Sequence, residues 1–191
     1  MKCAALIVTS TTHCATAQET LRVQDTVSAL RRIGWSVDVL TAGRNPILAA
    51  MLSPDVRVFA VPGLPCRRTL MFLRGIALAA RRDYQVLHGF DEGAGIVRAV
   101  DRVLLKRFAY IAEVHHPETV GTVTVARASA IVVPDEETLT HFAEPPPIAR
   151  VSVLPDPHAE LADNAFTAAE FAEAISGIYT YVLRTQPEVK P

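Results

Sequence analysis

Three short runs in the sequence gather side chains that can exchange protons, bind hydroxyl groups or ligate metal ions. They are residues 9–14 (TSTTHC), 88–93 (HGFDEG) and 113–118 (EVHHPE). Imidazole titrates near neutral pH, and carboxylates and hydroxyls form hydrogen bonds with sugars and anions. These runs are therefore where the sequence could carry out acid–base or binding chemistry.

The first run is rich in hydroxyl groups, which together with backbone amides can hold an anion or a sugar. It contains no glycine. Without glycine the backbone cannot approach a pyrophosphate closely, and the dinucleotide-binding pattern G-x-G-x-x-G is absent. A plain connecting loop is an equally good interpretation. The candidates for substrate binding in this run are Thr9, Ser10, Thr11 and His13.

The second run places His88 at the end of an apolar segment, followed by glycines and two carboxylates. This combination suits the binding of substrate hydroxyls, which makes His88, Asp91 and Glu92 candidates for substrate contacts. The alternative is structural. Asp91 would then cap the following helix, and His88 would pack at the end of its strand.

The third run contains adjacent histidines with flanking glutamates, a composition that suggests a metal site. Adjacent residues of a strand point to opposite faces, so His115 and His116 cannot easily share one ion. We therefore expect neither a metal nor a cofactor. One of the two histidines could face a cleft and act as a general base or as a ligand for a hydroxyl group.

The elements that position these runs alternate regularly along the chain. Apolar segments of strand length occur at residues 3–9, 35–41, 56–61, 85–88, 109–114, 130–133 and 151–154. Helical spacing of apolar residues occurs at 19–33, 67–82, 92–107, 134–142 and 167–184. Alternation of this kind predicts a doubly wound, Rossmann-like parallel α/β sheet, in which ligands bind beyond the carboxyl ends of the strands.

Composition narrows the class of protein. The chain has 191 residues, is 50% hydrophobic and carries a formal net charge of −1. One globular domain fits these values, whereas extended disorder and nucleic-acid binding do not. The three cysteines, Cys3, Cys14 and Cys66, have no disulfide or zinc-site spacing, which indicates a reducing, cytoplasmic location. No apolar run reaches the roughly 20 residues of a membrane helix.

Basic residues accompany the apolar residues of the helix predicted at 67–82. They are Arg67, Arg68, Arg74, Arg81 and Arg82. A solvated face of an ordinary amphipathic helix is the simpler interpretation, and contact with an anionic lipid surface is the alternative. Any membrane contact would therefore be peripheral.

The order of five landmarks resembles the N-terminal, acceptor-side lobe of GT-B glycosyltransferases of the family-4 type. The resemblance covers residues 6–157 and rests on residues 30–41 (LRRIGWSVDVLT), 84–91 (YQVLHGFD), 112–115 (AEVH), 128–135 (ASAIVVPD) and 151–155 (VSVLP). It implies that His115 contacts the transferring sugar or its acceptor and is the catalytic candidate. It also implies that His88 and Asp91 shape the acceptor pocket, with His116 as a further substrate-binding candidate.

The chain departs from this family after Pro155, where the second, nucleotide-sugar-binding lobe and its paired glutamates have no counterpart. The helix at 167–184 resembles the family's last helix, which packs back on the first lobe. We therefore expect a domain at residues 1–157, followed by a linker and helix at 158–191. The implied function is that of a truncated glycosyltransferase, inactive alone or dependent on a separate donor-lobe partner, with a sugar or lipid-linked acceptor.

Two alternatives stay open at this point. One is a non-catalytic binding or scaffold protein derived from a glycosyltransferase. The other is a small enzyme of another α/β family with His115 or Cys14 as its catalytic residue, although no nucleophile elbow or C-x-x-C motif was recognised. A missing lobe would leave a rim at residues 9–14, 88–92 and 115–118 exposed, with apolar residues beside it, which predicts a homodimer or heteromer.

Overall fold

Seven parallel strands form one sheet in the order β3-β2-β1-β4-β5-β6-β7. The computed structural model describes residues 3–9, 17–105, 108–117, 127–142, 150–155, 157–158 and 167–185. The strands are β1 (Ala4–Thr9), β2 (Ser36–Ala42), β3 (Arg57–Val61), β4 (Val86–Phe90), β5 (Ala109–Glu113), β6 (Ala130–Val133) and β7 (Val151–Val153). The sheet grows outward in both directions from β1, which confirms the predicted doubly wound, Rossmann-like fold.

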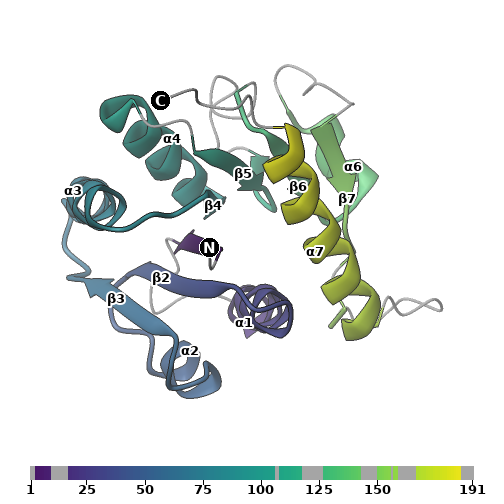
Figure 1. The fold of residues 1–191 in the computed structure, drawn as a ribbon, viewed down its shortest axis with the longest axis horizontal. Coiled ribbons are helices and arrows are strands. Elements are labelled where there is room, and N and C mark those ends of the chain that lie inside the picture. Colours follow the sequence, from purple (N-terminus) through teal and green to yellow (C-terminus); the bar gives the residue numbers. More distant parts are fainter. Residues whose placement is uncertain are drawn as a thin grey trace.

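Helices cover both faces of this sheet (Figure 1). Helices α1 (Ala17–Arg32), α2 (Pro46–Met51) and α7 (Ala168–Thr185) share a hydrophobic core with one face. Helices α3 (Arg67–Arg81) and α4 (Glu92–Leu104) share a second core with the other face. The short helix α6 (Glu136–Thr140) follows β6.

The central strands are apolar on both sides because helices lie over both. In β1, Ala5 and Ile7 point into the core beneath α1 and α7, whereas Leu6 and Val8 point into the core beneath α3 and α4. This alternation explains why the strand appears in the sequence as a continuous apolar run rather than as an apolar–polar alternation.

Helix α7 buries one face against the rest of the molecule and lies beside α1. Phe171, Ile175, Ile178, Tyr179 and Val182 are its buried side chains. A capping box begins this helix, since the Thr167 backbone N–H donates to Glu170 Oε2 at 2.8 Å and Glu170 N–H donates to Thr167 Oγ1 at 3.2 Å. Val182 is fully buried, and its neighbour Leu183 is partly buried at the margin of the core.

Two elements differ from the sequence-based expectation. Helix α2 was not predicted, because it spans only Pro46–Met51 and its signal lies in its first residues: the Asn45 side chain accepts a hydrogen bond from Leu48 N–H, and proline follows. Strand β4 continues to Phe90 instead of ending at His88, since Gly89 and Phe90 still pair with Val8 and Thr9.

A buried carboxylate on β2 ties several elements together. Asp38 accepts hydrogen bonds from Arg57, at 2.9 Å, and from Arg82 and Tyr84. Burial, reinforced by the bond to Asp38, raises the pKa of the Tyr84 phenol. This cluster links β2, the first residue of β3 and the segment before β4, which gives it a structural role.

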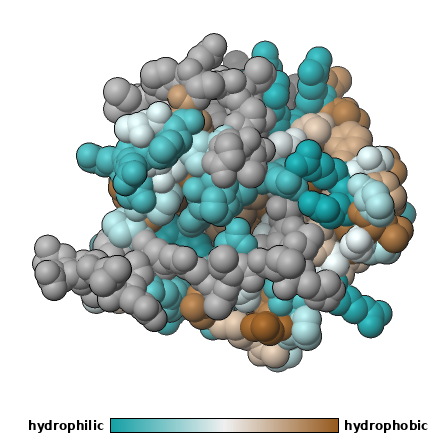
Figure 2. Space-filling view, turned by 180° about the vertical axis from the view of Figure 1, so that it is seen from behind, coloured by the Kyte–Doolittle hydropathy of each residue, from teal (hydrophilic) through white to brown (hydrophobic). Residues whose placement is uncertain are grey.

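Exposed large hydrophobic side chains are dispersed over several elements. They are Ile33, Ile47, Leu64, Leu73, Val103, Leu105, Val153 and Tyr181. In the view of Figure 2, hydrophilic side chains occupy the middle of the face, and hydrophobic ones lie mostly in separate patches toward its margins. No helix in the described part of the chain has the length and apolar character that crossing a membrane requires.

Candidate functional site

The carboxyl ends of three neighbouring strands, from which the three polar runs continue in the sequence, lie at one edge of the sheet. Strand β1 ends at Thr9, β4 at Phe90 and β5 at Glu113, and these strands are adjacent in the order β1-β4-β5. Thr9 itself is 1% exposed. Ser10, Thr11 and His13, as well as Thr12 and Cys14, lie outside the described residues.

Asp91 occupies a sharp turn between β4 and α4. Its φ of 44° and ψ of −115° are rarely adopted by a residue with a side chain. The turn also needs glycine on both sides. A Cβ at Gly89 would lie 2.4 Å from Ala94 Cα, and a Cβ at Gly93 would lie 2.2 Å from the Val8 carbonyl oxygen. The sequence G-F-D-E-G thus forms an elbow in which a strand turns directly into a closely packed helix.

The Asp91 carboxylate holds the loop after β5 instead of capping α4. Its Oδ1 accepts hydrogen bonds from the backbone N–H groups of His115 and His116, both at 2.8 Å. No side-chain capping bond is formed at the start of α4. Asp91 is thus the N-cap residue of α4 by position, but its carboxylate does not cap the helix and instead joins the second run to the third.

Glu92 turns the other way, toward α3. It accepts hydrogen bonds from Arg68 at 3.2 and 2.5 Å, and Arg67 lies 3.8 Å from it. The bond from Arg68 lowers the pKa of Glu92. Glu92 therefore lies in an ion pair with the basic helix, and its predicted contact with substrate remains a prediction.

Glu113, a flanking glutamate of the third run that was not among the candidate site residues, lies at the centre of a largely buried charge network. Arg22 of α1 donates from Nε to Glu113 Oε1 at 2.6 Å, and its other nitrogens donate to the carbonyls of Pro155 and Leu154 at 2.8 and 2.9 Å. The guanidinium also stacks on the Phe171 ring, 4.2 Å from its centroid. Arg22 and Glu113 thereby connect α1, β5, the segment after β7 and α7.

The charge state of Glu113 follows from its neighbours. Burial by itself raises the pKa of this carboxyl, but Arg22, with His115 and His88, outweighs burial and holds the pKa well below its ordinary value. Glu113 is therefore an ionised carboxylate in the interior of the protein, as expected for a buried charge with several donors.

His88 belongs to the interior rather than to an exposed rim. Its side chain is fully buried, and its ring stacks on Phe90 at a centroid distance of 4.7 Å. Nδ1 lies 2.9 Å from the Tyr179 hydroxyl, and Nε2 lies 3.1 Å from Glu113 Oε2 without hydrogen-bond angles. The expectation that His88 and Phe90 lie on an exposed rim is wrong, because β4 extends through both and α7 contributes Tyr179 beside them.

His115 is the partly exposed member of the network, with 18% of its side chain accessible. Its Nε2 lies 3.2 Å from Glu113 Oε1. Because Glu113 is ionised and can only accept, the proton of this hydrogen bond sits on Nε2, which leaves Nδ1 as the second, independent position of the ring. Burial lowers the pKa of His115, but the Glu113 carboxylate more than compensates, so that the pKa is raised above its ordinary value.

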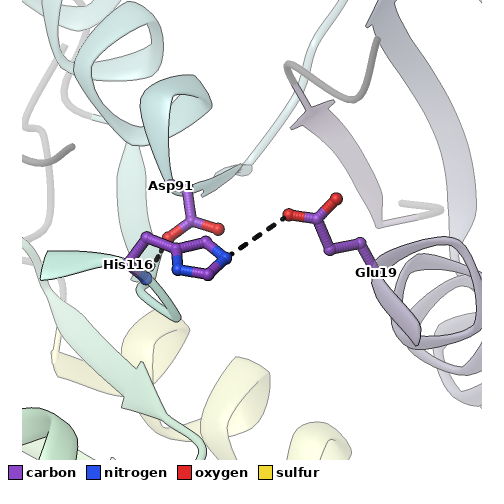
Figure 3. Close-up of side chains that lie close together, drawn as sticks. All are labelled: Glu19, Asp91 and His116. Atoms are coloured by element: carbon purple, nitrogen blue, oxygen red, sulfur yellow. Dashed lines mark hydrogen bonds and ion pairs between the residues drawn. The ribbon is translucent and has the colours of Figure 1, made fainter. Parts of the chain in front are cut away.

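His116 lies on the other side of Asp91, near the start of α1. Its Nε2 is 4.0 Å from Glu19 Oε1, and 55% of its side chain is exposed. One ligand atom each from Glu19, Asp91 and His116 lies within 4.8 Å of the others. Figure 3 shows the three side chains converging from α1, the β4–α4 elbow and the segment after β5. In the sequence, the adjacent His115 and His116 suggest a pair of metal ligands. In the structure the third run contributes only His116 to this group, and the other two members are carboxylates.

Arg22 and Glu113 were not among the candidate residues, although features of the sequence indicate that both are buried. Arg22 is spaced four and eight residues from Thr26 and Leu30, which are buried, so it lies on the inward face of α1. Glu113 is a charged residue in an otherwise apolar strand, AYIAE. A charged residue at a buried position indicates that an oppositely charged partner lies on another element, since neither charge is stable in the core alone.

The basic side chains of the α3 region have partners that favour the simpler interpretation of this helix. Arg67 and Arg68 lie beside Glu92, and Arg82 pairs with Asp38. Arg74 lies over the Phe59 ring, 5.3 Å from its centroid. These contacts account for four of the five arginines within the protein itself.

The exposed apolar rim that would support the predicted association is not seen in the described residues. None of the exposed large hydrophobic side chains of the described chain falls at positions 88–92 or 115–117. Phe90, the apolar residue of the rim, is 5% exposed. Association into a homodimer or heteromer therefore remains a prediction, which an exposed apolar rim does not support.

Comparisons with known proteins give a structural likeness only. No model of a known protein family and no curated protein matches the sequence. Among solved structures, LpCGTa in complex with UDP matches with a TM-score of 0.56 at 12% identity, over 84% of this chain and 53% of that one. Anabaena Alr3699/HepE with UDP and glucose matches with a TM-score of 0.57 at 11% identity, over 80% of this chain and 44% of that one.

A third structure agrees with these two. Arabidopsis thaliana UGT89C1 with UDP matches with a TM-score of 0.51 at 13% identity, over 98% of this chain and 56% of that one. This chain spans about half the length of each of the three structures. The likeness, together with the sheet order, shows that the chain has a GT-B-like, Rossmann-type fold of the kind found in these UDP-bound proteins.

Proposed function

We propose that the chain is the acceptor-side half of a glycosyltransferase-like protein and transfers a sugar only beside a partner that supplies a nucleotide-sugar lobe. The observation that carries this proposal is the His115–Glu113 pair at the carboxyl edge of the sheet. A partly exposed imidazole oriented by a buried carboxylate is an arrangement suited to a general base. The fold that holds it is shared with proteins whose structures contain UDP.

In this proposal His115 takes the proton of the acceptor. Nε2–H stays hydrogen-bonded to Glu113, so the free position of the ring is Nδ1. As the acceptor oxygen bonds to the anomeric carbon, its proton passes to Nδ1, and the bond to the diphosphate breaks with its electron pair leaving on the phosphate oxygen. The raised pKa of His115 makes it a stronger base than a free imidazole.

The remaining candidates take supporting roles in the proposal. The loop with Thr9, Ser10, Thr11 and His13 would lie on the phosphate side, where hydroxyls can stabilise the leaving group. His88 would hold Glu113 from within and not touch substrate, because its ring is enclosed. Asp91 would hold the backbone at His115 in place through its two hydrogen bonds.

The finer assignments belong to the same proposal. The five ordered landmarks support a family-4-type lobe, and the coverage of about half of each compared structure supports a chain that works with a separate second lobe. Cys3 is partly exposed, Cys66 is exposed, and both are free thiols. Free thiols suit a reducing cytoplasm.

The test uses the tagged chain recovered from its native cells with the proteins that stay bound to it. The recovered complex should release UDP from a UDP-sugar in the presence of acceptor-containing extract, whereas the chain alone should not. His115→Ala should recover the same partners and lose UDP release, while His141→Ala, which changes an exposed histidine at the end of α6, should keep it.

Equal UDP release by His115→Ala would overturn the catalytic role. A second candidate function, that of a non-catalytic binding protein, is favoured by one observation: His88, a residue of the resemblance motif, serves the core instead of a cleft. Stable recovery of partners with no UDP release by the wild-type complex would support that function and remove the first.

A further inference from the structure

We infer that Glu19, Asp91 and His116 form a binding site for one divalent transition-metal ion. The three side chains come from separate elements: the first turn of α1, the elbow after β4 and the segment after β5. Their ligand atoms lie within 4.8 Å of one another, and Figure 3 shows them pointing toward a common space. The inference does not rest on glycosyl transfer.

The geometry needs only a small adjustment to hold an ion. Ligand atoms bound to one ion at about 2.1 Å lie roughly 3–4 Å apart. Rotation of the His116 and Glu19 side chains would bring the ligand atoms closer together. His116 and Glu19 can rotate, because 55% and 27% of their side chains are exposed.

Asp91 is the fixed ligand of the three. The residue is 8% exposed, and both hydrogen bonds to its carboxylate, from His115 N–H and His116 N–H, end on Oδ1. In Figure 3 the second carboxylate oxygen is turned toward the space between the His116 ring and Glu19. A carboxylate oxygen that faces this space is positioned to bind a cation directly.

The hydrogen bonds to Oδ1 also serve the ligand geometry. Metal-binding carboxylates are commonly hydrogen-bonded through their other oxygen, which fixes their orientation. Here the bond from His116 N–H joins two of the three ligand residues directly, so that Asp91 and the His116 backbone are held in a fixed position relative to each other.

The donor set indicates the class of ion. Two carboxylates and one imidazole suit Mn²⁺, Fe²⁺ or Zn²⁺ better than Ca²⁺ or Mg²⁺, which prefer oxygen ligands throughout. Three protein ligands leave positions for water or a substrate oxygen, as in catalytic rather than structural sites. Because the chain places this site at the carboxyl edge, a phosphate oxygen could enter the open position.

The experiment is a titration of the metal-free protein with Mn²⁺, followed by electron paramagnetic resonance. We expect one tightly held Mn²⁺ per chain and nitrogen coupling from a bound imidazole. Glu19→Gln and His116→Ala should each weaken binding by about tenfold or more, and His116→Ala should also remove the nitrogen coupling. Mg²⁺ at equal concentration should displace little of the Mn²⁺.

Two variants act as matched controls. Glu137→Gln removes an exposed carboxylate on α6, and His158→Ala removes an imidazole that lies 2.7 Å from Asp25. Both should bind Mn²⁺ like the wild type. Asp91→Asn is read only if its circular dichroism and melting temperature match those of the wild type, since its carboxylate also holds the backbone.

Binding that is absent, or that stays unchanged in both Glu19→Gln and His116→Ala, would overturn the inference. So would loss of the nitrogen coupling in His158→Ala but not in His116→Ala. Since no sugar or partner is present in the titration, its failure leaves the proposed transfer function untouched, and failure of transfer leaves the metal site untouched.

Discussion

Arg22 and Glu113 form an ion pair at 2.6 Å between helix α1 and the end of strand β5, with both side chains essentially inaccessible to solvent. Arg22 holds the Glu113 carboxylate, which in turn orients His115. Arg22 also donates to two carbonyls after β7, so that it ties α1 both to β5 and to that segment. The same two residues therefore link the stability of the fold to the geometry of the candidate site.

Arg22→Met should strongly destabilise the protein. It would leave Glu113 buried without its guanidinium, and breaking one partner of a buried pair costs about 3–5 kcal/mol. The free energy of unfolding from urea titration measures this. Combining Arg22→Met with Glu113→Gln should recover part of the loss, because the uncompensated charge is then removed. A single Arg22→Met variant as stable as the wild type would contradict the role of the pair.

Stability should fall in acid because of Glu113. The pKa of this carboxyl is lowered in the folded protein, so its contribution is complete above the ordinary carboxyl pKa of about 4.5 and is lost as the pH falls below that value. Urea titrations between neutral pH and pH 3 should show a steeper loss for the wild type than for Glu113→Gln. Parallel curves for the two proteins would exclude Glu113 as the cause.

Tyr179→Phe should destabilise the protein by about 1–3 kcal/mol, because it removes the hydroxyl group beside Nδ1 of a fully buried histidine. Tyr181→Phe is the matched control, since Tyr181 lies on the same helix and is 49% exposed. Thermal melting of both variants makes the comparison. Equal melting temperatures for the two variants would mean that the contact with His88 adds nothing.

Alanine at Gly89 or Gly93 should prevent the elbow from packing. The added Cβ would overlap backbone atoms that cannot rotate away, so the cost should reach or exceed the roughly 1–3 kcal/mol of ordinary overpacking. Gly95→Ala and Gly177→Ala are suitable controls, because a Cβ at either position meets no atom within 4 Å. The elbow would not be as tight as described if Gly93→Ala melted like Gly95→Ala.

The isolated chain should bind nucleotide sugars weakly. If a partner supplies the nucleotide-binding lobe, calorimetric titration with UDP-glucose should show a Kd no lower than about 1 mM. A micromolar Kd would mean that this chain itself grips the nucleotide, which would remove the need for the partner in the proposed function.

The fold was predictable because its signal is local. Each buried strand is an apolar run of strand length, and each long helix shows apolar residues at helical spacing, so the order of elements follows from the printed sequence. The carboxyl edge as the place of the site followed in the same way, because parallel strands end on the same side.

The contacts within the site were harder to foresee, because they join residues distant in sequence. Asp91 has the residue type of a helix cap, and only the backbone N–H groups of His115 and His116 in space show that its carboxylate acts elsewhere. The sequence predicts that the strand ends at His88, because glycine follows. Gly89 and Phe90 nevertheless continue β4 and pair with β1. Arg22 and Glu19 were overlooked because a charged residue early in a helix is usually solvated.

The contacts of helix α7 have a consequence for how the protein is made. Phe171 and Tyr179 cover Arg22 and His88, yet they are synthesised tens of residues after Glu113. At the usual rate of about 5–20 residues per second, the nascent sheet would wait for seconds with its ionised groups uncovered. A chaperone or the ribosome surface would therefore meet a charged, incompletely closed intermediate. Slowing translation across residues 114–170 should lengthen the lifetime of that species without altering the finished protein.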